Sequence, residues 1–132
     1  MRRILTLMAC GLWLAPAHAD VDYQQFQRLT RSLLKVEAFN GDGSVSIGTG
    51  VVVAKGAVAT NCHVTRYARS IELVKGALRM AVETQQADIE HDLCLLYAAS
   101  TGEMQVASLR ERALHVGESV VAVGFIFGVA PR

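Results

Sequence analysis

The chain has 132 residues, of which 52% are hydrophobic and 19% charged, and its formal net charge is +1 at pH 7. A chain of about this length can enclose one hydrophobic core. Because its charges are nearly balanced and scattered, the sequence gives no electrostatic reason to expect nucleic acid or an anionic membrane as a partner.

The N-terminus has the pattern of a secretory signal peptide. Two arginines precede an apolar run from Ile4 to Ala15, and Ala17-His18-Ala19 supplies the small residues that a signal peptidase reads. The run is shorter than the roughly 20 residues that span a bilayer, although an uncleaved anchor stays an alternative. We therefore expect residues 1–19 to be removed and residues 20–132 to form an exported domain, periplasmic or secreted, without an integral membrane segment.

The mature part begins with a helical pattern and continues with short β-type runs. Tyr23, Phe26, Leu29 and Leu33 recur at a spacing of three to four residues, which predicts a short amphipathic helix. The β-type runs read, in order, LLKVEAF, VSIGTGVVVA, AVATN, SIELV, LRMAVETQ, DLCLLYA and ESVVAVGFIFG. Glycine-containing turns separate several of them, among them NGDGS, Lys55-Gly56 and a turn around Gly76. The sequence therefore predicts an all-β antiparallel barrel or sandwich.

Two side chains are predicted to lie where a β-type run changes abruptly into a turn. These are His63, within TNCHV, and Asp92, within HDLCLL. An alcohol nucleophile needs a base to take its proton, and that base needs a buried carboxylate to fix its tautomer. His63 and Asp92 suit these two roles. Each alone is equally consistent with a structural histidine or with a turn or cap aspartate.

The combination of motifs resembles the trypsin-like serine proteases, in particular their bacterial exported branch. Three stretches match in family order: GTGVVVAKGAVATNCHV, HDLCLL and LHVGESVVAVGFIFG. The resemblance runs from about Leu33 to Gly128. It implies a six-stranded antiparallel β-barrel, the first of the two barrels of that fold. It also implies that His63 is the general base and Asp92 its orienting acid, that the substrate is a peptide or protein, and that no cofactor is needed.

The resemblance bears on the two cysteines of the mature part, Cys62 and Cys94. An even number of cysteines in an oxidising compartment permits a disulfide. If His63 and Asp92 meet, the neighbouring cysteines come close enough for a bridge. Two buried free thiols are the alternative. The bridge usual in the family cannot be carried over, because there the cysteine more often follows the histidine.

A metal site is a rival interpretation of the same residues. Cys62, His63, His91, Asp92 and Cys94 are of types that bind zinc, but they lack C-x-x-C or H-x-x-x-H spacing. Neighbours on a strand, as Cys62 and His63 are expected to be, would also point to opposite faces. We therefore expect no metal. His91 is expected to be an exposed turn residue, and His115 has no evident partner.

The family's catalytic serine has no counterpart in this sequence. That serine lies in a G-x-S-G-G turn, whose backbone N–H groups also stabilise the oxyanion. The serines after the signal region are Ser32, Ser44, Ser46, Ser70, Ser100, Ser108 and Ser119, and none has this context. The sequence therefore reads as a protease domain truncated before its second barrel, and we expect it not to hydrolyse peptides by itself. A non-catalytic barrel that binds a peptide or protein partner is the alternative function, and an unrelated small β-barrel is a third reading.

Overall fold

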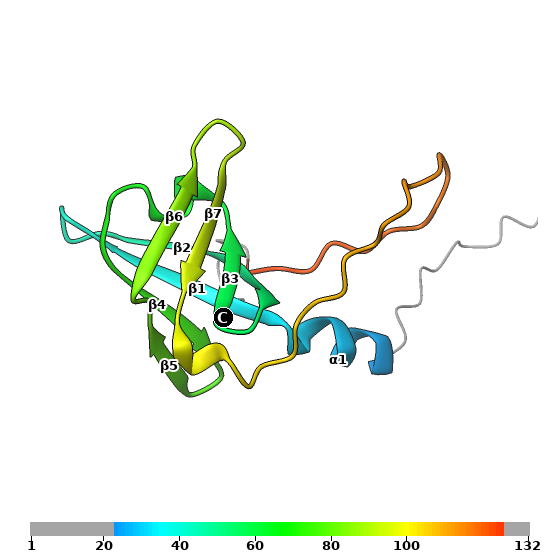
Figure 1. Cartoon of the computed structure of the whole chain (residues 1–132), viewed down its shortest axis with the longest axis horizontal. Coiled ribbons are helices and arrows are strands. Elements are labelled where there is room, and N and C mark those ends of the chain that lie inside the picture. Colours follow the sequence, from blue (N-terminus) through cyan, green and yellow to red (C-terminus); the bar gives the residue numbers. More distant parts are fainter. Residues whose placement is uncertain (1–22, 126–132) are drawn as a thin grey trace, which may run out of the picture.

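The computed structural model describes residues 23–125 and shows a curled antiparallel sheet with short helices at its margins (Figure 1). The elements are α1 (Tyr23–Arg31), β1 (Leu33–Asn40), β2 (Val45–Ala54), β3 (Ala57–Thr60), α2 (Cys62–Thr65), β4 (Ala68–Lys75), β5 (Leu78–Ala81), β6 (Thr84–Asp88), β7 (Leu93–Tyr97) and a 3-10 turn, η1 (Ala99–Thr101). The strands lie in the order β5-β4-β1-β2-β3-β7-β6, and all neighbours are antiparallel. The predicted all-β fold with a short N-terminal helix is confirmed.

Alternating burial explains why these runs form strands around one core. In β1, Leu34, Val36 and Ala38 are fully buried, while the residues between them are partly exposed. Successive side chains of a strand point to opposite faces, so this alternation turns one face inward. The core consists of Leu34, Val36, Val52, Val58, Val64, Leu73, Met80, Leu96 and Ala98.

The tight turns form where glycine permits a positive φ. Gly56 joins β2 to β3 with φ 74°, and Gly76 joins β4 to β5 with φ 57°. A side chain at either position would be strained, because L-residues rarely adopt this region. Both connections follow the sequence prediction.

The strand count differs from the six that the resemblance implied, because one predicted strand bends. The run beginning at Leu78 is divided into β5 and β6 by Val82 and Glu83. The Val82 N–H donates to Ile71 O of β4 at 3.0 Å, whereas the Glu83 N–H donates to Tyr97 O of β7 at 2.8 Å. The chain thus passes from β5, at one edge of the sheet, directly to β6, at the other edge. The seven strands correspond to six if β5 and β6 are counted as one bent strand, and this bend curls the sheet into a partial barrel.

The strand predicted for residues 118–128 is wrong over residues 118–125, and the remainder of that stretch lies outside the described residues. From Gly102 onward the described chain has no helix or strand, and Figure 1 shows this segment leaving the sheet (yellow to orange) and then turning back toward it (red). The Phe125 N–H returns to β2, where it donates to Thr49 Oγ1 at 2.7 Å. Val120 is 68% exposed. An apolar run forms a strand only where a partner satisfies its backbone, and none of the described strands pairs with this one.

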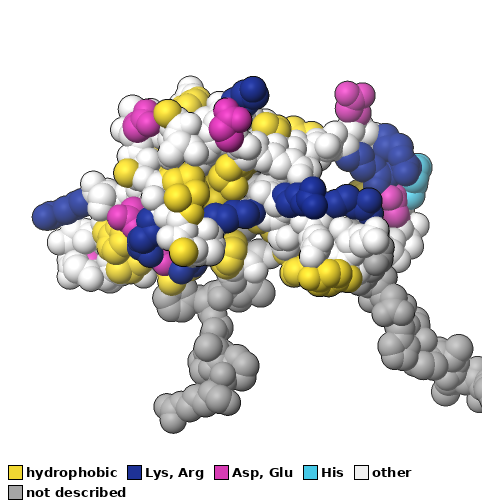
Figure 2. Space-filling view, turned by 90° about the horizontal axis from the view of Figure 1, so that it is seen from below, with side chains coloured by type: hydrophobic (Ala, Val, Ile, Leu, Met, Phe, Trp, Pro, Cys, Tyr) yellow, Lys and Arg dark blue, Asp and Glu magenta, His cyan; other side chains and the backbone are white. Residues whose placement is uncertain are grey.

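Helix α1 lies against the end of β4, where Lys75 caps its carboxyl end. Lys75 Nζ donates to the carbonyl oxygens of Thr30, Arg31 and Leu33 at 2.6, 2.8 and 2.9 Å. Leu33, which fits the helical spacing, belongs instead to β1. The apolar side of the helix is largely exposed, with Phe26 at 45%. Seen from below, hydrophobic patches and a row of Lys and Arg side chains share one face (Figure 2).

The described helices offer no membrane crossing. None of them is long and apolar enough to span a bilayer. The predicted signal peptide, residues 1–19, lies outside the described residues.

Candidate active site

The residue expected at a strand end, His63, lies instead on the one-turn helix α2. Strand β3 ends at Thr60, whose Oγ1 donates to Thr49 O at 2.8 Å, and Asn61 then makes an extended link to the helix. The turn directs Cys62 and Val64 inward, where they are 2% and 7% exposed, whereas the His63 side chain is 61% exposed. The neighbours Cys62 and His63 do diverge, but through a helical turn rather than through strand alternation.

Glycine in β2 makes room for this helix. A Cβ on Gly48 would lie 2.6 and 2.9 Å from the methyl carbons of Val64, which is closer than real carbon contacts allow. Helix α2 can therefore pack on β2 only where β2 carries no side chain. This gives a physical reason for the first glycine of the GTG sequence that precedes the histidine.

Asp92 occupies a strained position between the β6–β7 loop and β7. Its φ of 52° is the only positive value among the non-glycine residues that the structure describes. Aspartate is one of the few side chains that tolerate this region. The backbone then enters β7 at Leu93, so the Asp92 carboxylate stands at the mouth of that strand.

His63 and Asp92 are in direct contact. The His63 N–H donates to Asp92 Oδ1 at 2.8 Å, and His63 Nδ1 lies 2.6 Å from Asp92 Oδ2. The hydrogen bond from the His63 side chain, followed by that from its backbone, lowers the pKa of Asp92 below its usual range. An ionised carboxylate at this distance favours the tautomer with the proton on Nδ1, which leaves the Nε2 lone pair as an acceptor.

Both side chains of the pair are exposed to solvent, whereas an orienting carboxylate was expected to be buried. The Asp92 side chain is 40% exposed, although the sequence suggested a buried acid. Among the described residues, the His63 ring bonds only to Asp92. The described serines, which have no G-x-S-G-G context, form no hydrogen bond with it.

Cys62 and Cys94 are joined by a disulfide beside this pair. Their Cα atoms are 5.0 Å apart, and the two residues are separated by 32 positions. The register of β3 and β7 pairs Thr60 with Cys94, which brings the residues after Thr60 alongside those before Cys94. The bridge thus links α2, which carries His63, to β7, which follows Asp92.

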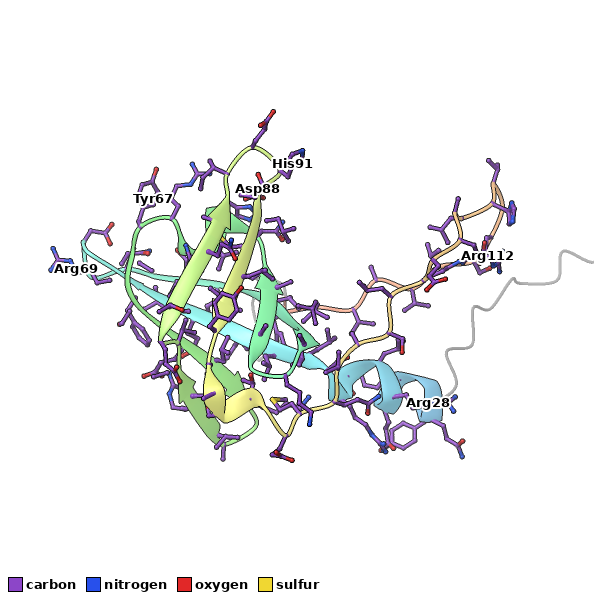
Figure 3. The ribbon with its side chains drawn as sticks, in the orientation of Figure 1. Arg28, Tyr67, Arg69, Asp88, His91 and Arg112 are labelled. Atoms are coloured by element: carbon purple, nitrogen blue, oxygen red, sulfur yellow. A yellow bond between two sulfur atoms is a disulfide. The ribbon has the colours of Figure 1, made fainter. Side chains whose placement is uncertain are left out.

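The remaining histidines of the described chain lie apart from His63. His91 is exposed in the β6–β7 loop, as expected, and its Nδ1 lies 2.9 Å from Asp88 Oδ2 (Figure 3). The backbone N–H of His115 donates to Glu118 Oε2 at 3.2 Å. Within residues 23–125, no three His, Cys, Asp or Glu side chains form a group that could hold a metal ion.

Asn61 is a contributor to the site that sequence reasoning did not assign. Its Nδ2 donates to both the carbonyl oxygen and Oδ2 of Asp92, each at 3.2 Å. The sequence places Asn61 two residues before His63, which indicates that it lies near the site. Only the tertiary structure shows that it contacts Asp92.

The chain is similar to known proteins in its sequence family and in its fold. The family described as the trypsin-like peptidase domain matches residues 48–131, which is well over half of the chain. No curated protein matches the chain by sequence.

Two solved protease structures are similar in fold. The serine endoprotease from Yersinia pestis has a TM-score of 0.63 and 22% identity over 76% of this chain and 38% of its own. The active form of the Rv3671c protease from M. tuberculosis has a TM-score of 0.61 and 20% identity over 67% of this chain and 40% of its own. The chain therefore spans well under half the length of either structure. With the domain match, these similarities lead to one conclusion: the chain belongs to the trypsin-like peptidase domain family.

Proposed function

We propose that this chain is the N-terminal part of an exported trypsin-like serine endopeptidase. The observation that carries the proposal is the 2.6 Å contact between His63 Nδ1 and Asp92 Oδ2, which leaves Nε2 free to accept a proton. In this proposal, residues 1–19 are the signal peptide, residues 20–132 begin the protease domain, and the substrate is a peptide or protein in the periplasm or outside the cell.

The proposed mechanism assigns a separate task to each side chain. His63 Nε2 takes the proton of a serine hydroxyl as that oxygen attacks the substrate carbonyl. Asp92 holds the ring in the required tautomer and stabilises the imidazolium that forms. We propose that the serine and the oxyanion-stabilising N–H groups come from a second barrel. Support for this comes from the two solved proteases, of which this chain covers only 40% and 38%.

The test begins with the intact mass of the protein from its native source. A mass well above that of residues 20–132 is expected if a second barrel follows. That native protein should then hydrolyse a fluorogenic peptide or casein. His63→Ala should lower kcat by several orders of magnitude, and Asp92→Asn should lower it by about four orders of magnitude. The remaining groups cannot replace a member of the triad.

His91→Ala provides the matched control. His91 is another exposed histidine hydrogen-bonded to an aspartate, so its loss should leave the rate within a few-fold of wild type. A native product that ends at Arg132 and hydrolyses nothing would overturn the peptidase proposal. The alternative, a protease-derived barrel that binds a peptide or protein without cleaving it, would then lead.

A further inference from the structure

Asn61 makes an unusual use of its side chain. It occupies the N-cap position of α2, where asparagine commonly accepts a hydrogen bond from the first turn of the helix. Here it makes no capping bond. Its Nδ2 instead reaches across to Asp92, a residue 31 positions away, and donates to that residue's backbone carbonyl and to Oδ2.

Three consecutive residues converge on Asp92. Its carbonyl oxygen accepts from Asn61 Nδ2 and from the Cys62 N–H at 3.3 Å. Its Oδ1 accepts from the His63 N–H, and its Oδ2 is shared by His63 Nδ1 and Asn61 Nδ2. Asn61 is thus the one side chain among them that holds both the backbone and the carboxylate of Asp92.

This double contact matters because Asp92 has a positive φ of 52°, a backbone conformation whose cost in free energy the surrounding contacts must offset. A carboxylate can also rotate about its Cβ–Cγ bond, and that rotation would turn Oδ2 away from the imidazole. Donors on both oxygens and on the carbonyl oppose these two movements together. Both atoms that face the Asn61 amide are acceptors, so its NH₂ end must point toward them.

We infer that Asn61 is a positioning residue for the histidine–aspartate pair: it holds Asp92 so that Oδ2 faces His63 Nδ1. It acts on His63 only through Asp92. The inference rests on the proposed function, in which this pair is the base and its orienting acid. Its geometry can nevertheless be tested without any hydrolysis.

The experiment is NMR spectroscopy of the full chain, isotopically labelled. Two signals are followed: the downfield proton on His63 Nδ1, and the carboxylate carbon of Asp92 as pH is lowered. In wild type at low temperature, the Nδ1 proton should be visible and protected in the sense that it exchanges with water more slowly than the Nδ1 proton of His91, whose contact with Asp88 is longer. Asn61→Ala removes both donated bonds, so this proton should exchange faster and the pKa of Asp92 should rise toward its ordinary range.

Two further variants grade the effect. Asn61→Asp keeps the shape but puts a second carboxylate beside Asp92, and should disturb both signals more than alanine does. Asn61→Gln keeps an amide NH₂ donor on a longer side chain and should restore part of the protection. The graded series would not be expected from a purely structural role, and it keeps the test valid if one variant does not fold.

Asn40→Ala is the matched control. Asn40 Nδ2 also donates two hydrogen bonds, to Ser44 Oγ and Ser46 Oγ at 2.9 Å each, but in the β1–β2 hairpin. The Asn40→Ala variant should leave both the His63 Nδ1 proton and the Asp92 carboxylate signal unchanged. Folded Asn61 variants with wild-type Nδ1 exchange and an unchanged Asp92 titration would overturn the inference alone. A wild-type chain without a protected Nδ1 proton would overturn both the inference and the pair on which the proposed function rests.

Discussion

Two histidine–aspartate pairs use the same hydrogen-bond pattern around the β6–β7 loop. In each, one carboxylate faces both the backbone N–H and the Nδ1 of a histidine. The distances are 2.8 and 2.6 Å for His63 with Asp92, and 3.2 and 2.9 Å for His91 with Asp88. The residues of the first pair are 29 positions apart in the sequence, whereas those of the second pair are three positions apart.

The difference shows that local chemistry alone does not define a candidate active site. The His91 pair needs only the end of β6, where Asp88 lies, and the loop that follows it. The His63 pair needs α2 and β7 to dock, and Asn61 and the disulfide then support it. Side chains held by separate rigid elements keep a precise geometry, which acid–base catalysis requires.

The largest effect on stability is expected from the disulfide. Replacing both cysteines, as Cys62→Ala/Cys94→Ala, should lower the free energy of unfolding by about 3–4 kcal/mol, because the bridge closes a loop of about thirty residues in the unfolded chain. Urea denaturation measures the change, and reduced wild type should behave similarly. An intact mass that does not rise by two hydrogens on reduction would show that the thiols are free in the protein as isolated.

A smaller loss is expected from crowding α2. Gly48→Ala should cost about 1–3 kcal/mol, because its new methyl group would meet Val64 in the core. Gly41→Ala is a matched control, since its Cβ would meet mainly the Arg69 guanidinium, which is free to swing aside. It should stay within about 0.5 kcal/mol of wild type by urea denaturation. Equal losses of stability in Gly48→Ala and Gly41→Ala would mean that α2 moves to accommodate the new methyl group without strain.

Acid should weaken the His63 pair through Asp92. The pKa of Asp92 is lowered in the folded protein, chiefly by the hydrogen bond from the His63 side chain. A group with a lowered folded pKa stabilises the protein above its unfolded pKa of about 3.9, and this contribution disappears as pH falls through the folded value. The stability difference between wild type and Asp92→Asn should therefore shrink toward low pH. A difference that stays constant with pH would contradict this.

The smallest effect is expected for the local pair. His91→Ala removes an exposed ring from a turn and should change the free energy of unfolding by no more than about 0.5 kcal/mol. The protected proton on His63 Nδ1 should persist in this variant. Loss of that NMR signal would mean that the geometry of the His63 pair depends on the His91 pair.

Some elements were predictable because their signals are local. The alternation of Leu34, Val36 and Ala38 marks β1, and glycine at positions 56 and 76 marks two tight turns. Helix α2 was missed because one turn is too short to show helical periodicity. The strand predicted from residue 118 onward failed over the described residues because pairing depends on a partner that local pattern does not reveal.

The sequence by itself determined the residue types of the site, the β class of the fold and the nearness of Cys62 to His63 and of Cys94 to Asp92. Tertiary structure alone decided which of these groups meet. The pairing of Thr60 with Cys94 brings Asn61, Cys62 and His63 beside Asp92. A slip of one residue between β3 and β7 would turn every side chain of the slipped strand to the other face. The packing of the whole sheet selects the register in which His63 and Asp92 touch, because in that register Val58, Cys94 and Leu96 are all fully buried.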